Sequence, residues 1–331
     1  MHYKYRVSVL IPCYNGSQFI DRSFNSILQQ TEKKIEIIFV DDGSNDCSLT
    51  VAKKYIGKFN AIESQLRIIQ KPNGGAASAI KVALDMSTGK YILPLDVDDE
   101  LLADSCKIQA DYLDSNTDCG LVLTNGYKVF DDGQEIQLVR ANGQLQNKNH
   151  IFRGLLSGVI NNVPGMYMVR GDILRNYYSN HSFLITNYGQ NLQLLMPSSY
   201  SHKAGYVNVP LLKYYVHKGS HSNPGLYDKE IANLKGYLDI RICMLEGMNL
   251  STKEYFELAH QSFYEAALIV DAKYKRRKEY NFHYKAIKEY RNPSFQEKME
   301  YSILNRSLWQ YYYRFCSKFR IIWKRGTRLS Y

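Results

Sequence analysis

The stretch Tyr91-Ile92-Leu93-Pro94-Leu95-Asp96-Val97-Asp98-Asp99 decides the fold of this chain. A largely apolar run leads directly into three carboxylates, which is typical of a buried strand whose carboxyl end opens into a site of concentrated negative charge. Carboxylates this close repel one another, and their pKa values rise unless a cation or hydrogen-bond donors keep them ionised. Mg²⁺ or Mn²⁺ suits the pattern, because both ions prefer oxygen ligands. The alternative is an acidic turn that caps a helix beginning near Leu101.

Length and composition are those of an ordinary globular protein. The 331 residues suffice for about two domains, and 45% of them are hydrophobic and 22% charged. The six cysteines form no Cys-x-x-Cys pair, so we expect free thiols in a reducing cytoplasm and neither a structural zinc nor a disulfide framework. No apolar leader precedes the first predicted strand, and no run of about 18 apolar residues predicts a membrane span.

The net charge of +10 is unevenly distributed. Residues 271–331 contain 16 Lys and Arg against 5 Asp and Glu, which leaves 26 against 27 for residues 1–270. A basic segment of this kind attracts anionic surfaces, either membrane headgroups or nucleic acid. No nucleic-acid-binding motif accompanies the charge, so a nucleic-acid partner is not expected.

Strand-like and helix-like segments alternate along the first hundred residues. Apolar runs predict strands over 7–11, 35–40, 66–70 and 91–95, and apolar residues at helical spacing predict helices over 18–30, 49–56 and 76–84. This alternation indicates an α/β fold with a mostly parallel sheet and helices on both faces.

Polar residues follow the predicted strands. In open sheets of this type the ligand lies beyond the carboxyl ends of the strands. We therefore expect Tyr14, Asn15, Asp42, the loop Gly74-Gly75 and the acidic stretch 96–99 to line one crevice. A dinucleotide-dependent dehydrogenase is disfavoured, since no Gly-x-Gly-x-x-Gly follows the first strand.

Four motifs in this part of the chain resemble those of family 2 glycosyltransferases with the GT-A fold. They are Val9-Leu10-Ile11-Pro12-Cys13-Tyr14-Asn15, Val40-Asp41-Asp42-Gly43-Ser44, Asn73-Gly74-Gly75-Ala76-Ala77-Ser78-Ala79, and Gly89-Lys90-Tyr91-Ile92 together with residues 95–99. The resemblance implies a GT-A, Rossmann-like sheet with a C-terminal helical extension. It also implies a nucleotide-sugar-binding half over residues 1–100, an acceptor-binding half over 101–226 and a helical, basic region over 227–331.

The same resemblance assigns roles within the crevice, whose expected ligand is a UDP-sugar donor. Asp42 resembles the residue that contacts the base, Asp96 the one that faces the ribose, and Asp98 the ligand of Mn²⁺ or Mg²⁺ at the diphosphate. Asp99 would lie near the metal or the donor sugar. The remaining nucleotide-binding candidates are Pro12, Tyr14, Asn15, Asn73, Gly74, Gly75 and Val97.

One departure concerns Lys81. Where the family often has Ala-Arg-Asn, this chain has Ala79-Ile80-Lys81, so that Lys81 either reaches a phosphate or is a solvated helix lysine. Farther on, residues 214–222 resemble the segment that closes over the diphosphate. There His217 is a candidate metal ligand, because neutral imidazole binds such ions, and Lys218 and His221 are secondary candidates for phosphate contact.

The acceptor side shows a larger departure. Many relatives have a Glu-Asp pair whose aspartate is the general base, but this chain has Gln190-Asn191, and an amide has no basic site at neutral pH. Three interpretations remain. The amides bind the acceptor while Asp99 or Asp172 takes the proton; a weak base or the substrate phosphate suffices; or the protein binds nucleotide-sugar with little turnover.

Residues from 227 onward are predicted to be helical. Within residues 301–328, aromatic and basic residues recur at spacings of three and four, which suits either a helix on an anionic membrane surface or a core-facing helix with a solvated basic face. The resulting expectation is an inverting, metal-dependent glycosyltransferase in the cytoplasm or at the inner face of the cytoplasmic membrane. Its acceptor would be a glycan or a lipid-linked molecule in surface polysaccharide assembly. The alternative is a nucleotide-sugar-binding protein or partner subunit, and the oligomeric state stays open.

Overall fold

The computed structural model describes residues 3–138, 151–160, 163–217, 226–250 and 252–305. The chain divides into two compact units, which are described separately. The first comprises Met1–Phe152 with Asn162–Lys218, and the second comprises Arg153–Asn161 with Gly219–Tyr331. Among the described residues, no helix is both long enough and apolar enough to cross a membrane.

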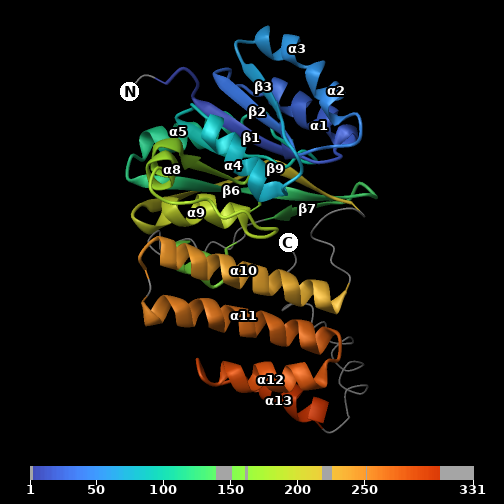
Figure 1. Cartoon of the computed structure of the whole chain (residues 1–331), viewed down its shortest axis with the longest axis vertical. Coiled ribbons are helices and arrows are strands. Elements are labelled where there is room, and N and C mark those ends of the chain that lie inside the picture. The colour runs from blue at the N-terminus through green and yellow to red at the C-terminus, as the bar shows by residue number, and fades with distance from the viewer. Residues whose placement is uncertain (1–2, 139–150, 161–162, 218–225, 251, 306–331) are drawn as a thin grey trace. The chain divides into compact units, whose positions relative to one another are not determined.

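A nine-stranded sheet forms the centre of the first unit (Figure 1). Its strands are β1 (Val7–Cys13), β2 (Ile35–Asp41), β3 (Gln65–Gln70), β4 (Tyr91–Pro94), β5 (Glu100–Leu101), β6 (Cys119–Phe130), β7 (Glu135–Leu138), β8 (Tyr167–Arg170) and β9 (Lys203–Val216). The order is β3-β2-β1-β4-β8-β6-β9-β5, with β7 paired to β6. The first four of these strands are parallel, whereas β8 runs antiparallel between β4 and β6.

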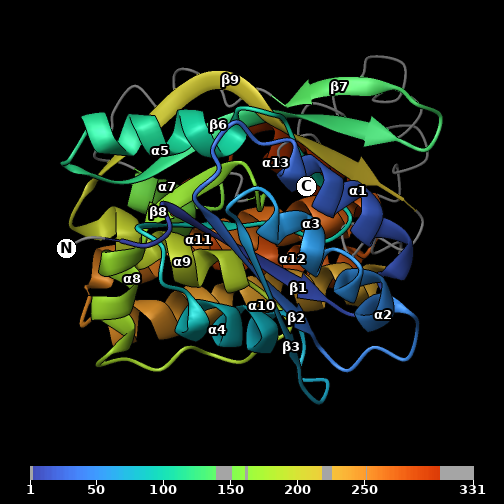
Figure 2. The same cartoon turned by 90° about the horizontal axis from the view of Figure 1, so that it is seen from above.

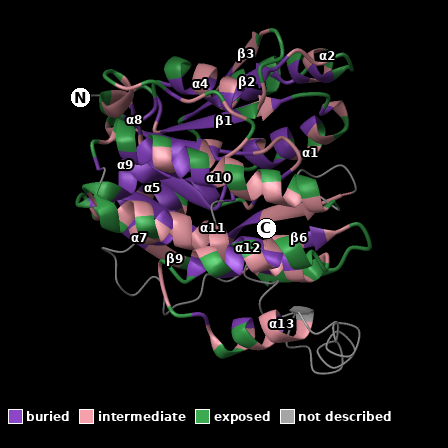
Figure 3. Ribbon diagram, turned by 60° about the horizontal axis from the view of Figure 1, so that its bottom comes forward, coloured by how far each residue is buried: buried purple, intermediate pink, exposed green. Residues whose placement is uncertain are grey.

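The central parallel strands β1 and β2 are largely apolar and buried, as is typical of strands covered by helices on both faces. All seven residues of β2 are buried, and β1, β2 and β3 lie side by side (Figure 2). Burial extends over most of β1 (Figure 3).

The described helices that begin and end within this unit are α1 (Ser17–Leu28), α2 (Ser48–Lys53), α3 (Ile56–Asn60), α4 (Ala76–Met86), α5 (Ser105–Ser115), α8 (Gly171–Tyr178) and α9 (Gln190–Tyr200). A further helix, α7 (Ile151–Leu156), crosses the boundary between the units. The α/β prediction is confirmed.

Two local predictions were wrong. The helix considered near Leu101 begins only at Ser105, because Glu100 and Leu101 form β5 and pair with β9. The single helix predicted over 49–56 is instead the two short helices α2 and α3. The break between them lets the rings of both Tyr55 and Phe59 pack edge-on against Phe24.

The described part of the second unit contains the predicted C-terminal helices. They are α10 (Tyr227–Gly247), α11 (Lys253–Lys273), α12 (Arg277–Ile287) and α13 (Phe295–Asn305), and the first three lie side by side in succession (Figure 1). Their apolar core is built around Leu268, Tyr280, Tyr284 and Ile287.

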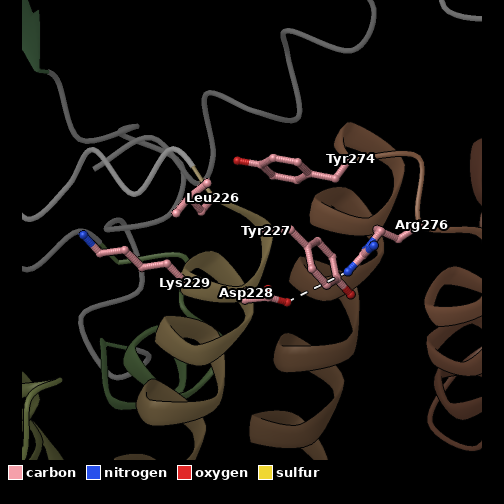
Figure 4. A pocket seen from close by; sticks show the side chains of 6 residues that line it. All are labelled: Leu226, Tyr227, Asp228, Lys229, Tyr274 and Arg276. Atoms are coloured by element: carbon pink, nitrogen blue, oxygen red, sulfur yellow. Dashed lines mark ion pairs between the residues drawn. The ribbon is translucent and has the colours of Figure 1, made fainter.

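A pocket opens where α10 begins and α11 ends (Figure 4). It is lined by Leu226, Tyr227, Asp228, Lys229, Tyr274 and Arg276. The guanidinium of Arg276 lies 4.4 Å from the centre of the Tyr227 ring and 4.0 Å from a carboxylate oxygen of Asp228. Arg276 thus makes a cation–π contact and a long, exposed ion pair at the pocket wall.

Asp271 is expected to be essential for the stability of this unit. Its carboxylate is fully buried, accepts a hydrogen bond of 2.8 Å from the hydroxyl of Tyr227, and lies 2.6 Å from Nδ1 of His283. Asp271→Ala leaves the buried His283 and the half-buried Tyr227 without their acceptor and should lower the free energy of unfolding by about 3 kcal/mol. Asp228→Ala is the matched control, because the side chain of Asp228 is 93% exposed. Equal urea midpoints for the two variants would contradict this assignment.

Candidate functional site

Polar loops at the carboxyl ends of the parallel strands are tied to one another. Asn15, which follows β1, adopts a left-handed backbone with φ of 51°. Its N–H donates to Oγ of Ser44 at 2.9 Å, and its own Oδ1 accepts from the N–H of Asn45 at 2.8 Å. The loops after β1 and β2 therefore form one framework, with the side chain of Tyr14 half-exposed beside it and Pro12 paired with Val40 within the sheet.

Asp42 joins the loop after β2 to the glycine loop that precedes α4. Its carboxylate is almost fully buried and accepts from the N–H of Gly74 at 3.0 Å and from the N–H of Gly75 at 2.7 Å. The ammonium group of Lys71 forms an ion pair with the same carboxylate. Gly75 has a φ of +84°, which L-amino acids with a side chain rarely adopt, so the loop needs glycine there.

A cavity of about 460 Å³ lies beside this framework. It is lined by Gly43, Ser44, Asn45, Gln70, Lys71 and Pro72. Asn73 adjoins this lining, because a Cβ added to Gly43 would meet the main-chain nitrogen of Asn73 at 2.7 Å. The ammonium group of Lys81 forms an ion pair with Asp85 one turn farther along α4.

The acidic stretch turns back on itself directly after β4. The N–H of Asp99 donates to the carbonyl oxygen of Asp96 at 3.1 Å, and this turn gathers three carboxylates. One oxygen from each of Asp96, Asp98 and Asp99 lies within 4.8 Å of the other two. Val97 anchors the turn on the loop after β1, where a Cβ on Gly16 would lie 2.9 Å from the Val97 side chain.

Burial and mutual repulsion oppose the ionisation of these three carboxylates unless a cation balances their charge. Burial, reinforced by the charge of Asp98, raises the pKa of Asp96 to about 7. Burial and the charges of Asp98 and Asp96 raise the pKa of Asp99 well above its ordinary value. Oδ1 of Asp99 accepts from the N–H of Tyr215 at 2.9 Å, whereas its buried Oδ2 has no hydrogen-bond partner among the described residues. These carboxylate oxygens are suitable ligands for a divalent cation such as Mg²⁺ or Mn²⁺.

His217 lies at the same cluster. Its Nε2 is 2.9 Å from Oδ2 of Asp98, and its ring stacks on Phe19 of α1 with centroids 4.8 Å apart. The structure therefore brings together Asp98 and His217, the two residues considered as metal ligands. Lys218, His221 and the segment 306–328 lie outside the described residues.

The amides Gln190 and Asn191 form the first turn of α9. Oδ1 of Asn191 accepts a hydrogen bond of 2.7 Å from the hydroxyl of Tyr167. Tyr167 begins β8, whose antiparallel pairing with β4 brings it to the carboxyl end of β4, and the N–H of Gly165 donates to the carbonyl oxygen of Pro94 there. Asn191 thus lies at the same edge of the sheet as the acidic turn.

The suggestion that Asp172 takes the acceptor proton was wrong. Asp172 follows Arg170, which pairs with Tyr91 at the amino end of β4, whereas the acidic turn follows the carboxyl end. The two ends are roughly 10 Å apart along the strand. Asp99, the other candidate base, is fully buried and is bonded to the main chain of β9.

Sequence reasoning missed several residues that shape the site. Lys71 neutralises Asp42, Tyr167 holds Asn191, and Arg22 contacts both Tyr215 and the carbonyl oxygen of Asp98. None of them belongs to a motif. Their partners lie 24 to 193 positions away in the sequence, so no spacing rule would have identified them.

Comparisons with known proteins agree with this geometry. The family model described as glycosyl transferase family 2 matches residues 8–178, just over half of the chain. An uncharacterised glycosyltransferase of Rickettsia conorii is 33% identical over 170 residues, a match that covers 49% of this chain and 27% of that protein. The chain thus spans about a quarter of the length of this relative.

Two solved structures share the fold. Staphylococcus aureus TarS in complex with UDP-GlcNAc superposes with a TM-score of 0.53 at 16% identity, covering 86% of this chain and 90% of that one. The mannosyltransferase PcManGT of Pyrobaculum calidifontis, in complex with GDP-Man and Mn²⁺, gives 0.53 at 16% identity, covering 82% and 76%. With the sheet order and the family match taken together, this chain belongs to glycosyltransferase family 2 and has the GT-A fold.

Proposed function

We propose that this protein transfers a sugar, with inversion, from a UDP-sugar to a glycan or lipid-linked acceptor in surface polysaccharide or glycoconjugate biosynthesis. The observation that carries the proposal is the acidic turn, with Asp96, Asp98 and Asp99 converging beside His217 at the carboxyl edge of a GT-A sheet. Membrane docking through residues 301–328 at the inner face of the cytoplasmic membrane belongs to the same proposal.

The nucleotide half of the donor would occupy the cavity between the loops after β2 and β3. Asp42 and Lys71 supply a fixed charge pair there, and the hydrogen bonds from Gly74 and Gly75 keep the loops in place before any ligand arrives. A site that is already ordered loses little conformational entropy on binding. Asp96, the first carboxylate of the acidic turn, is the residue proposed to face the ribose.

Asp98 and His217 would hold Mn²⁺ or Mg²⁺ at the diphosphate. The bound cation, acting as a Lewis acid, supplies stabilisation of the negative charge that grows on the departing diphosphate. Asp99 would contribute a buried carboxylate to the site, which the N–H of Tyr215 fixes by a hydrogen bond to Oδ1.

Gln190 and Asn191 would bind the acceptor hydroxyl. Neither amide can take its proton, so their contribution is orientation of the acceptor against the donor sugar. Oδ1 of Asn191 already accepts from Tyr167, which holds this amide in a fixed orientation. With Asp172 at the wrong end of the sheet and Asp99 buried, proton removal is left to a weak base or to the substrate phosphate.

A second candidate function, nucleotide-sugar binding with little turnover, is favoured by the same two amides. It predicts tight binding of UDP-sugars without product. Calorimetry that gives a binding isotherm for a UDP-sugar, combined with no transfer across a broad acceptor panel, would support it. A single productive acceptor would eliminate it.

Screening nucleotide-sugars for thermal stabilisation of the full chain tests the main proposal. A UDP-sugar in excess over its Kd should raise the melting temperature, since it binds only the folded state. The shift should be larger with Mn²⁺ than with EDTA, and GDP-sugars should stabilise less. Stabilisation by none of the nucleotide-sugars, with or without metal, would contradict the proposal.

A further inference from the structure

The side chain of Arg22 extends from α1 and contacts the acidic turn. One guanidinium nitrogen, Nη2, donates to the main-chain carbonyl oxygen of Asp98. The guanidinium carbon lies 3.5 Å from the centre of the Tyr215 ring, which is a close cation–π contact. Its Nε–H is buried and has no hydrogen-bond partner among the described residues. Arg22 thus contacts the turn and the end of β9 at the same time.

Tyr215 extends this contact to the carboxylates. Its main-chain N–H donates to Oδ1 of Asp99 at 2.9 Å, and its hydroxyl donates to Oε2 of Glu100 at 2.8 Å. Fixing the Tyr215 ring therefore also fixes the donor on which one oxygen of Asp99 depends.

The periodicities of helix and strand match at this contact. Phe19 and Arg22 are three residues apart and lie on one face of α1, whereas Tyr215 and His217 are two residues apart at the end of β9. Phe19 stacks on His217 while Arg22 stacks on Tyr215. One face of α1 therefore holds both aromatic side chains against the acidic turn.

We propose that Arg22 is a positioning residue that presets the metal site, holding the main chain of Asp98 and, through Tyr215, the carboxylate of Asp99 in the geometry that binds a divalent cation. This inference rests on the proposed function and deepens it. Lysine cannot replace arginine in this role, because its ammonium group neither stacks flat on an aromatic ring nor offers several donors in one plane.

The consequence is a change in metal affinity that is separate from nucleotide binding. Residues that orient metal ligands typically change metal affinity by about 10-fold to 100-fold when replaced. Arg22→Lys should therefore raise the Kd for Mn²⁺, measured by calorimetry on the full chain, by at least about tenfold. The affinity for UDP measured in EDTA should stay unchanged, because the contacts of Arg22 within the described part of the chain are with the acidic turn, Phe19 and Tyr215.

Arg67→Lys is the matched control. Arg67 on β3 also donates to a main-chain carbonyl oxygen, that of Met86 at 2.6 Å, but lies away from the acidic turn. This variant should bind Mn²⁺ like the wild type. Tyr215→Leu removes the stacked ring and should reproduce the effect of Arg22→Lys, whereas Tyr215→Phe keeps the ring and should bind Mn²⁺ normally. The comparison of Tyr215→Leu with Tyr215→Phe tests the positioning role even if Arg22→Lys does not fold.

The outcomes separate this inference from the function on which it rests. Wild-type affinity for Mn²⁺ in both Arg22→Lys and Tyr215→Leu would overturn the positioning role and leave the proposed function intact. A wild-type protein that binds no Mn²⁺ would overturn both. A loss of Mn²⁺ affinity in Arg67→Lys equal to that in Arg22→Lys would show a general effect of arginine replacement and would also overturn the role.

Discussion

Replacing Asp98 by asparagine is expected to reduce Mn²⁺-dependent release of UDP from a UDP-sugar by about a thousandfold. Asp98 is the carboxylate that lies both among the three clustered aspartates and beside His217, with Nε2 of the imidazole 2.9 Å away. Asparagine keeps the shape of the side chain and removes its charge. The expected loss therefore reports the charge and not the packing. Coupled detection of UDP measures this loss whatever the natural acceptor is, because water can serve as one.

Asp85→Asn provides the control for this prediction. Asp85 is an exposed carboxylate on α4 whose partner is Lys81, and its replacement removes the same charge away from the acidic turn. Its rate of UDP release should equal that of the wild type. If Asp98→Asn released UDP at the wild-type rate, and EDTA left that rate unchanged, the metal site would not lie at this turn.

The second large effect that we expect is an increase in the rate of sugar transfer. Replacing Asn191 by aspartate should raise the rate of transfer by about a hundredfold, the usual contribution of a positioned general base. The structure accommodates the carboxylate, because the hydroxyl of Tyr167 already donates to this side chain and Asn191 lies in the first turn of α9, where the helix dipole favours negative charge. The measurement is the initial rate of UDP release with each UDP-sugar that stabilises the protein.

Asn180→Asp is the charge-matched control for this gain. Asn180 is exposed just after α8, so the same new charge falls away from the crevice, and its rate should not change. A folded Asn191→Asp variant whose rate equals or falls below that of the wild type would show that Asn191 does not occupy the position of the base.

The parallel half of the sheet could be predicted from sequence because its strands are short and rich in apolar, β-branched residues. Ile35–Asp41 is buried on both faces, and its mostly apolar sequence can be recognised without knowledge of the tertiary structure. The acidic turn was predictable for the same reason, since its three carboxylates follow a buried strand directly. Asp98 and His217 could both be identified as candidate metal ligands, although 119 positions separate them in the chain.

Contacts made by single residues outside the motifs could not be predicted from the sequence. In the sequence, Arg22 is an ordinary polar residue of an amphipathic helix, and only the folded structure shows its contact with Tyr215. Asp172 was considered as a base because of its place in the chain, but the antiparallel direction of β8 puts it at the opposite end of β4. The two-residue strand at Glu100 is likewise created by its pairing with β9 and by no local preference.

A calorimetric titration of UDP into the full chain, performed in Mn²⁺ and again in EDTA, tests the central claim most directly. If Asp98 and His217 hold a cation at the diphosphate, UDP should bind at least about tenfold more tightly in Mn²⁺, and Asp98→Asn should abolish that difference. Equal affinity in Mn²⁺ and in EDTA for the wild-type protein, or no binding of UDP in either, would contradict the account.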